Sequence, residues 1–568
     1  MAADPGARAD GPGAAPYEIN VAVLFEATAA RVPDRPAVVH RGATRSFGEL
    51  ADRSRRLARY LADRGLGCHT ERAGLAGHET GQDLLAQYLH NGPEYLEGAL
   101  GSFRARVAPF NVNYRYVVEE LVQLFADARP RAVQFHARYA PVLAEVLAVH
   151  GPIDVLLQVA DHSGRALLPG AVDYESALAS VVPSLDVRPA PDDLYVLYTG
   201  GTTGRPKGVL WRQADIAVSA FGLVDRRSGA EWTSLESQLA AISPTARRML
   251  ASAPFMHGAA QWGVLQTLCE ANTVVVQNDV DRLDPADIWD TVERERVNVL
   301  TIVGDAFARP LLDEIEARPR DVSSLRIITS GGAALQPANK QRLLDAVPGL
   351  RLIDGMGSSE AGSLGRAQTN ADQQAAARVF EPSSGTTVVA DDLGEVLAPG
   401  HDGIGWLATG GRVPLGYLGD PAKTAATFPT IGGVRFSVPG DRARLLPDGL
   451  IEVLGRDAVT INTGGEKVFA EEVESAVKAH PGVVDTVVCG RPSERWGSEI
   501  VAIVATRDGE PIDRDELIAE CAHHLARYKL PKAIVFVPEV RRNPNGKADY
   551  RWAVETARAA SNPARPAS

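Results

Sequence analysis

The sequence has little of what several classes of protein require. Its 568 residues include four cysteines, Cys68, Cys269, Cys489 and Cys521, and no two of them form a C-x-x-C pair. Neither a disulfide framework nor a thiolate zinc site is therefore predicted, and a reducing, cytoplasmic location fits this composition. The chain also lacks an uninterrupted apolar run of the roughly 18 residues that a membrane-spanning helix needs, so no transmembrane segment is expected.

Basic charge and two common catalytic motifs are missing as well. The formal net charge is −12, whereas a general nucleic-acid binder normally carries a basic face, so no nucleic-acid partner is expected. The twelve histidines show no H-E-x-x-H spacing, and no G-x-S-x-G occurs. Zinc hydrolysis and serine-nucleophile chemistry are therefore unsupported.

Alternating short apolar runs and helical patterns are what the chain does contain. "FGELADRSRRLARYLADRGL" has apolar residues at helical spacing, and "RPAVVH", "DLYVLYTGG", "TVVVQ", "VNVLTIVG" and "LRIITSGG" have the β-branched composition of buried strands. Because glycine or polar turns and then helical patterns follow such runs, the sequence predicts an α/β fold of helix-covered, mostly parallel sheets. A helical excursion is expected over residues 226–250.

The length of the chain exceeds one hydrophobic core, so more than one domain is expected. The segments "DDLGEVLAPGHDGIGWLATGG" and "DRARLLPDGLIEVLGR" have the turn-rich alternation of a small antiparallel β subdomain. We predict a large N-terminal domain over residues 17–455 and a small, mobile α+β C-terminal domain over residues 456–560. Residues 1–16 and 561–568 are rich in Ala, Pro and other small residues and are expected to be disordered tails.

A glycine-threonine segment, "YTGGTTGRPKG" at residues 198–208, directly follows an apolar strand. Glycines let successive backbone N–H groups face one point, and Thr hydroxyls and Lys207 add donors and charge, which is suited to phosphate. The P-loop pattern G-x-x-x-x-G-K-[ST] fails because Gly208 follows Lys207. On this segment alone, a surface turn between strand and helix is the simpler alternative.

Further motifs follow in a fixed order. They are "PFMHGAAQW" (254–262), "GGAAL" (331–335), "GMGSSEAG" (355–362), "GYLGDPAKTAATF" (416–428), "PGDRARLLPDG" (439–449), "GRDAVTINTGGEKVFAEEVE" (455–474), "YKLPK" (528–532) and "NPNGKADY" (543–550). Together with the glycine-threonine loop, they closely resemble the adenylate-forming superfamily, which comprises acyl-CoA synthetases, peptide-synthetase adenylation domains and luciferases. The resemblance extends over nearly the whole chain.

This resemblance implies an ATP- and Mg²⁺-dependent acid:CoA ligase, which converts a carboxylic acid through an acyl-adenylate to its CoA thioester. The implied catalytic residues are Lys547, Glu360 and His257, and Thr199 and Glu360 are the implied contacts of Mg²⁺. The implied binding residues for ATP and coenzyme A are Thr199, Gly200, Gly201, Thr202, Thr203, Gly204, Lys207, Gly331, Gly332, Ala333, Met356, Gly357, Ser358, Ser359, Asp441, Arg456, Gly464, Gly465, Glu466 and Lys467.

Two of these assignments have a specific mechanical role in the family. The lysine that Lys547 matches bridges the acyl carboxylate and the α-phosphate during adenylation, and rotation of the C-terminal domain then replaces it with the "GGEK" loop for thioester formation. In many relatives the hinge residue is Asp or Lys at the place of Ala458, so the pivot of the rotation stays open here. Met356 stands where the family usually has an aromatic residue that stacks on adenine.

The identity of the acid and of the group that accepts the acyl chain stays open between alternatives. Within the superfamily, "NGPEYLEGALGSFRARVAPFNVNYRY", "VLWRQ" and "INTGGEKVFAEEVE" look most like bacterial long-chain fatty-acyl and steroid side-chain CoA ligases, which implies a medium- or long-chain fatty acid or a steroid side-chain acid. A fatty acyl-AMP ligase that loads a carrier protein is one alternative. A catalytically inactive nucleotide-binding scaffold is another. Homo-oligomerisation stays open.

Overall fold

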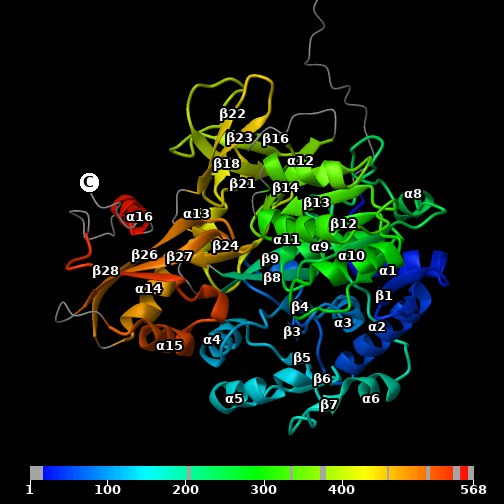
Figure 1. The fold of residues 1–568 in the computed structure, drawn as a ribbon. Helices are drawn as coiled ribbons and strands as arrows, with labels where there is room; N and C mark the ends of the chain where they lie inside the picture. Colours follow the sequence, from blue (N-terminus) through cyan, green and yellow to red (C-terminus); the bar gives the residue numbers. More distant parts are fainter. Residues whose placement is uncertain are drawn as a thin grey trace, which may run out of the picture.

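The structure is a computed structural model that describes residues 17–200, 206–332, 335, 337–370, 379–456, 460–480, 482–506, 512–541 and 550–560. Figure 1 shows the N-terminal elements and the central sheets forming the larger part of the molecule, with the elements after residue 460 packed to one side. None of the helices in these ranges is long and apolar enough to cross a membrane.

One five-stranded sheet is parallel throughout. Its strands run in the order β4 (Ala108–Asn111), β3 (Leu84–Tyr88), β5 (Ala132–His136), β6 (Val155–Val159) and β7 (Val172–Asp173). The connecting helices are α3 (Pro93–Arg104), α4 (Val118–Ala128), α5 (Ala140–His150) and α6 (Tyr174–Ala179). Strands β3 to β6 are almost entirely buried, as expected for a parallel sheet covered by helices.

A larger sheet follows, and its first half is also parallel. Strands β1 (Pro36–His40), β11 (Thr273–Val276), β10 (Arg248–Ala251), β12 (Val299–Ile302), β13 (Ile327–Gly331) and β14 (Arg351–Ser358) pair in that order, with β2 (Ala43–Ser46) antiparallel at the edge. Its helices are α1 (Val21–Arg31), α2 (Phe47–Ala62), α9 (Gly258–Cys269), α10 (Pro285–Arg294), α11 (Gly304–Ala317) and α12 (Pro337–Ala346). Helix α2 begins at a capping box formed by Ser46 and Glu49.

The second half of this sheet is antiparallel and forms the β subdomain. It continues from β14 through β15 (Gly362–Thr369), β16 (Val379–Pro382), β23 (Ile451–Arg456), β22 (Asp441–Leu445), β18 (Gly405–Gly410), β21 (Val434–Ser437) and β20 (Thr430–Ile431), and β17 (Thr386–Val389) pairs with β18. The α/β class, the large N-terminal domain and the predicted β subdomain are thereby confirmed, although the subdomain is continuous with the parallel strands.

The segment after residue 460 has its own core. Strands β26 (Val483–Ser493), β27 (Gly497–Thr506) and β28 (Ala533–Phe536) form a mixed sheet packed with α14 (Ala470–Lys478), α15 (Arg514–His524) and α16 (Tyr550–Ala559). A separate hairpin consists of β24 (Thr460–Thr463) and β25 (Glu466–Phe469). This is the small α+β unit that the sequence predicts.

Two sequence predictions were wrong in detail. The segment 226–250 contains only one short helix, α8 (Leu235–Ala240), and its end enters strand β10 of the large sheet. Met249 and Leu250 of this strand are buried and pair with both β11 and β12. Strand β8 (Leu194–Gly200) does not join a parallel sheet. It pairs antiparallel with β9 (Pro206–Arg212), and β19 (Gly416–Tyr417) pairs with β9, so the glycine-threonine loop connects two strands instead of a strand and a helix. Helices α7 (Gln213–Ser219) and α13 (Pro421–Thr427) follow β9 and β19.

Asn111 joins three segments that meet where β4 and β8 end. Its side-chain amide donates to the backbone oxygens of Tyr198 and Met256, at 2.9 Å and 2.7 Å, and its side-chain oxygen accepts from the backbone N–H of Tyr198 at 2.8 Å. Asn111 is 6% exposed. Because Tyr198 precedes Thr199 and Met256 precedes His257, this one side chain fixes the approach of two candidate site segments.

We predict that Asn111→Ala lowers the free energy of unfolding by about 2–4 kcal/mol, since a buried polar group left without a partner costs roughly 1–3 kcal/mol and three backbone groups are affected. Denaturant titration followed by tryptophan fluorescence measures this loss. The control is Asn113→Ala, because Asn113 is partly exposed. Its side chain donates to the Tyr528 hydroxyl and accepts from the backbone N–H of Arg115. An Asn111→Ala variant as stable as the control would contradict the assignment.

Candidate active site

The ends of the glycine-threonine hairpin bring Thr199 and Lys207 together. The two residues are direct partners in the β8–β9 ladder, and residues 201–205 lie outside the described ranges. The Lys207 ammonium group is 2.7 Å from Asp420 Oδ2 and 5.6 Å from the centre of the Tyr417 ring. A phosphate bound here would therefore compete with Asp420 for the lysine.

Glu360 belongs to the same neighbourhood. Its carboxylate accepts a hydrogen bond from the Tyr417 hydroxyl at 3.1 Å, and its backbone oxygen accepts from Ser437 at 2.5 Å. Tyr417 thus contacts both residues: the Lys207 ammonium group lies over its ring, and its hydroxyl donates to Glu360. Among the described residues, no cluster of three or more His, Cys, Asp and Glu side chains is arranged to hold a metal. Glu360 is an oxygen ligand of the kind that Mg²⁺ prefers, and substrate phosphates and water would have to supply the rest.

The two glycine-containing motifs of the nucleotide side adjoin each other. Gly331 pairs with Gly355 in the parallel ladder of β13 and β14, and Gly332 follows with φ of 81°. A side chain at Gly357 would stand 2.4 Å from the backbone oxygen of Gly362, so only glycine permits this close approach of β14 and β15.

The remaining residues of these motifs differ in their surroundings. Met356 is partly buried and packs against the apolar core of the β subdomain, which leaves its predicted contact with adenine untested. Ser358 is buried, and Ser359 offers its backbone oxygen to the indole N–H of Trp211 at 2.9 Å. Ala333 lies outside the described residues.

The two candidate ribose contacts are cross-strand neighbours. Asp441 begins β22 and Arg456 ends β23, and the two residues are paired in the antiparallel register. The side chain of Arg456 lies outside the described part of the chain. The sequence separates these residues by fifteen positions, and the hairpin brings them side by side.

The "GGEK" segment forms the tip of the β24–β25 hairpin. Gly464 and Gly465 both have positive φ, 58° and 84°, as a two-residue hairpin turn of this type requires. The Gly464 N–H donates to the backbone oxygen of Trp496 at 3.0 Å, and a side chain at Gly465 would meet Val303 at 2.6 Å. The tip therefore packs between Trp496 of the C-terminal unit and Val303 of the larger N-terminal part. The side chain of Lys467 is not described.

Glu466 follows this turn and contacts the N-terminal part of the molecule. Its Oε1 atom accepts from Arg115 at 2.7 Å and lies 3.0 Å from His257 Nε2. Burial by itself would raise the pKa of this carboxyl, but His257, Arg115 and Lys529 outweigh that effect and lower it to about 2. Glu466 is 8% exposed, so it is a buried, ionised carboxylate held by cations from other segments.

More polar contacts support this docking. Asn113 donates to the Tyr528 hydroxyl at 2.9 Å, Lys529 lies 2.8 Å from Glu120, and His524 lies 2.8 Å from Glu119. Arg309 also donates to the backbone oxygen of Glu494. The unit after residue 460 is thus bound to β4, α4 and α11 of the larger part.

A cavity of about 220 Å³ opens between the docked parts. Glu466 and Gly464 line it together with aromatic and basic side chains, which include Tyr114, Arg115, Arg282, Arg495, Trp496, Tyr528 and Lys532. The pKa of Lys532 is lowered by burial and by the neighbouring charges of Arg527 and Arg495. This crowding of cations favours an anionic ligand at the cavity.

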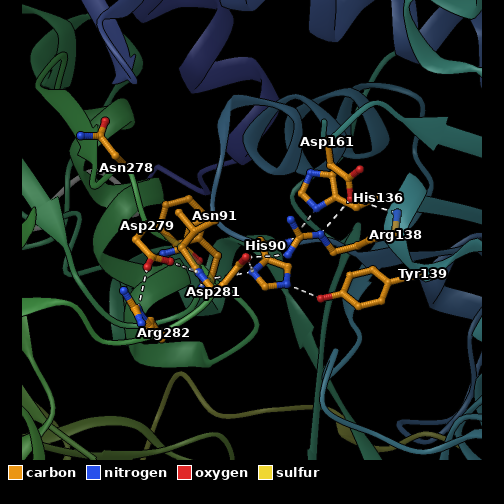
Figure 2. Close-up of polar contacts among 12 residues, drawn as sticks. His90, Asn91, His136, Arg138, Tyr139, Asp161, Asn278, Asp279, Asp281 and Arg282 are labelled. Carbon is orange, nitrogen blue, oxygen red and sulfur yellow. Dashed lines mark hydrogen bonds and ion pairs between the residues drawn. The ribbon is translucent and has the colours of Figure 1, made fainter. Parts of the chain in front are cut away.

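One wall of this cavity is braced by the polar cluster in Figure 2. His90 Nδ1 lies 3.0 Å from the backbone oxygen of Val280, and its Nε2 contacts the Tyr139 hydroxyl. Arg138 donates to Asp281 at 2.6 Å. Burial is the main cause that lowers the pKa of His90. A neutral His90 therefore joins the β3 sheet to the 277–283 segment, and the wall is held from both sides.

A second, narrower cavity of about 10 Å³ lies between α3, β4, β8 and α9. Its walls are mainly apolar, and they include Leu96, Ala99, Phe103, Phe110, Val264 and Leu265. Gln261 crosses it: the Tyr195 hydroxyl donates to Gln261 at 2.5 Å, and Gln261 donates to the Tyr95 hydroxyl at 2.7 Å. Gln261 lies one helical turn after His257, and its backbone N–H donates to the His257 backbone oxygen at 3.1 Å, so this cavity is one turn of α9 away from His257.

Sequence analysis missed several residues that the structure places at these sites. Tyr417 and Asp420 belong to the "GYLGDPAKTAATF" motif, and Arg115 to the "NVNYRY" segment, so a search of those motifs for charged and aromatic residues would have found them. Lys532 is the last residue of the "YKLPK" motif, which is its one signal in the sequence. Trp496 belongs to none of the motifs. The predicted residues Gly201, Thr202, Thr203, Gly204 and Lys547 lie outside the described residues.

Comparisons with known proteins cover nearly the whole chain. The AMP-binding enzyme family matches residues 25–418, and the AMP-binding enzyme C-terminal domain matches residues 472–547. The chain is 54% identical over 541 residues to the medium-chain acyl-CoA ligase Mig of Mycobacterium avium, which covers 95% of this chain and 98% of that protein. It is 38% identical over 546 residues to the 3-oxocholest-4-en-26-oate–CoA ligase of Rhodococcus rhodochrous, covering 94% and 95%.

The fold is similar to that of solved structures as well. The amide bond synthetase McbA from Marinactinospora thermotolerans superposes with a TM-score of 0.76 at 21% identity, and the match covers 94% of this chain and 99% of that one. An o-succinylbenzoate CoA synthetase from Bacillus subtilis gives a TM-score of 0.72 at 21% identity, covering 92% and 96%. At this level of identity the likeness concerns the fold alone.

The contact between His524 and Glu119 predicts a pH dependence of stability. Hydrogen bonding to Glu119 raises the pKa of His524 above its usual 6.5. Its contribution is therefore fully present below pH 6.5 and is lost as the pH rises through the raised value. We predict that His524→Gln lowers the midpoint of thermal unfolding at pH 6 and that the difference from the wild type vanishes by pH 9. His523→Gln, an exposed neighbour on the same helix, is the control. A difference that is independent of pH would contradict the role of this pair.

Proposed function

The chain belongs to the AMP-binding enzyme family and is an ATP-dependent acid:CoA ligase that acts through an acyl-adenylate, and from this premise we propose which groups carry each step. The two half-reactions need different surroundings. Adenylation brings two anions, a carboxylate and the α-phosphate, into contact and must neutralise the charge of the departing pyrophosphate. Thioester formation then needs a thiol at the same carbonyl.

For adenylation, we assign the phosphates to the glycine-threonine loop and Lys207, Mg²⁺ to Glu360 with Thr199, and the ribose to Asp441 and Arg456. Support comes from the convergence of Lys207, Tyr417 and Glu360, and from the pairing of Asp441 with Arg456. Glycine-containing β13 and β14 are assigned to the adenine side. Lys547 is assigned to the acyl carboxylate and the α-phosphate, where a positioned cation is worth roughly 3–4 kcal/mol.

For thioester formation, we assign coenzyme A to the larger cavity. Its anionic phosphates suit Arg282, Arg495 and Lys532, and its pantetheine arm suits the narrow passage beside Gly464 and Trp496. The cavity ends at Glu466, next to His257, where the adenylate's acyl carbonyl is expected. The observation that supports this assignment is the docked hairpin, and under this proposal the described arrangement is that of the second half-reaction. Under this proposal, the C-terminal domain at residues 456–560 rotates against the N-terminal domain between the half-reactions, and ATP and CoA are drawn from the cytoplasm.

For the acid, we propose an unbranched medium-chain fatty acid whose chain enters at the narrower cavity. At about 10 Å³ this cavity has room for no more than one water, so the side chains that line it must move apart when the acid binds. Each buried CH₂ contributes about 0.8 kcal/mol, which favours a chain laid along the apolar walls. A chain that extends as far as Gln261 must displace its hydrogen bonds with Tyr95 and Tyr195, which opposes further growth. A rigid multi-ring acid would have to separate α3 from α9. The name of the 54% identical relative agrees with this choice.

The test is ATP–pyrophosphate exchange over straight-chain acids from four to eighteen carbons, with 3-oxocholest-4-en-26-oate and an aromatic acid, followed by thioester detection with CoA. We expect kcat/KM to rise by up to about fourfold per added CH₂, the equivalent of 0.8 kcal/mol, and to fall again for long chains. Lys547→Ala is the matched control, because it should lose exchange and still form thioester from a supplied acyl-adenylate.

Three results would count against parts of this proposal. Absence of exchange with every acid would remove the ligase assignment. Exchange without any CoA thioester would favour the acyl-AMP ligase that loads a carrier protein. Equal or better use of the steroid acid would remove the medium-chain assignment.

A further inference from the structure

The narrower cavity, at which the acid enters under the function proposed above, has three polar side chains among its apolar walls. Tyr95 on α3, Tyr195 on β8 and Gln261 on α9 line it together. The Tyr195 hydroxyl donates to Gln261 Oε1 at 2.5 Å, and Gln261 Nε2 donates to the Tyr95 hydroxyl at 2.7 Å. Because the three residues are only 2%, 2% and 7% exposed, this chain of hydrogen bonds is buried.

One donor of this chain is left over. A hydroxyl has one proton to give, and a glutamine amide offers an oxygen on one side and N–H groups on the other. Tyr195 gives its proton to Gln261, whereas Tyr95 accepts from Gln261, and no acceptor for the Tyr95 proton is present among the described residues. Burial raises the pKa of both tyrosines, so both hydroxyls keep their protons at neutral pH.

The other two polar side chains at this cavity are committed elsewhere. The Asn111 side-chain oxygen accepts from the backbone N–H of Tyr198, and Gln87 donates to the backbone oxygen of Tyr95 at 2.7 Å. A buried donor without a partner is unfavourable. The acceptor for the Tyr95 proton therefore has to come from whatever occupies the cavity.

Aromatic contacts hold the two tyrosine rings in place. The Tyr95 ring meets the edge of Phe255, with ring centres 5.6 Å apart, and the Tyr195 ring lies 6.3 Å from Phe103 and 5.8 Å from Phe221. When an acid widens the cavity, we therefore expect the aliphatic side chains of its walls to move and the Tyr95 hydroxyl to keep its position.

We propose that Tyr95 is a specificity-determining residue and that the preferred acid, within the medium-chain class proposed above, carries an oxygen atom on its chain. This oxygen accepts the Tyr95 proton. A hydroxyl, an ether or a carbonyl oxygen meets the requirement, whereas a CH₂ at the same place leaves the donor without a partner. Because Gln261 holds the Tyr95 hydroxyl at a fixed depth, the oxygen has to stand at one particular position along the chain.

The experiment is ATP–pyrophosphate exchange with octanoate and with straight-chain acids of the same length in which an ether oxygen replaces one CH₂, at each position from C4 to C7. An ether oxygen is close to CH₂ in size and only accepts hydrogen bonds. With the wild type, we expect kcat/KM to peak at one ether position, about tenfold above the other ethers, which corresponds to one neutral hydrogen bond. Comparison among the ethers removes their shared difference in hydrophobicity from octanoate.

Two matched variants locate the donor. Tyr95→Phe removes the unused proton, so the peak should disappear while octanoate remains a substrate. Tyr195→Phe removes a hydroxyl whose proton is already given to Gln261, so the peak should persist. A flat ether series with the wild type, or an unchanged peak with Tyr95→Phe, would overturn the inference.

Exchange with octanoate separates this result from the proposed function. A flat ether series together with exchange of octanoate removes the role of Tyr95 and leaves the medium-chain assignment standing. Absence of exchange with every acid removes both. The wild-type series decides the question by itself if a variant does not fold.

Discussion

The arrangement of the whole site depends on one buried carboxylate. Glu466 is shared between Arg115 and His257, both from the N-terminal part, while its own backbone belongs to the β24–β25 hairpin. Burying this charge is favourable only because cations surround it, and removing one partner of such a pair typically costs about 3–5 kcal/mol. The carboxylate therefore holds the β24–β25 hairpin against the N-terminal part, where Glu466 forms part of the wall of the larger cavity. It also holds Nε2 of His257 toward itself.

On the proposed assignments, the three substrates meet at this point because each is held by a different part of the fold. The β8–β9 hairpin and the glycine-containing edge of the large sheet would supply donors and cations for the nucleotide. Helix α9 leads from His257 into the narrow apolar cavity, and the docked C-terminal unit supplies the basic and aromatic walls of the other. The acid is thus enclosed by rigid elements, whereas the acceptor thiol arrives through a surface that exists only while two parts of the chain are in contact.

Much of this was predictable from the sequence, and the rest was not for physical reasons. The strands at "TVVV" and "IITSG" and the helix at residues 47–62 were evident from composition and periodicity. The resemblance pointed to Glu360, Asp441 and the "GGEK" segment, whose roles stay predictions. The antiparallel pairing of β8 with β9 was missed because a fully buried strand has the same apolar composition in either kind of sheet. The helical excursion expected over residues 226–250 was mostly wrong, because the helix there, α8, covers only the six residues Leu235–Ala240. The contact of Glu466 with Arg115 and His257 joins positions more than 200 residues apart, which no local pattern records.

We propose that this docked arrangement carries out thioester formation and excludes adenylation. It can be tested by joining Glu119 on α4 to His524 on α15, whose side chains lie 2.8 Å apart, in a Glu119→Cys/His524→Cys variant. A Cys68→Ser background removes the one free cysteine of the four that is not buried, and a short cleavable bismaleimide makes the bridge. The bridged enzyme should convert supplied acyl-adenylate and CoA at nearly the unbridged rate, lose pyrophosphate exchange and regain it when the bridge is cut. Full exchange by the bridged enzyme would contradict the claim.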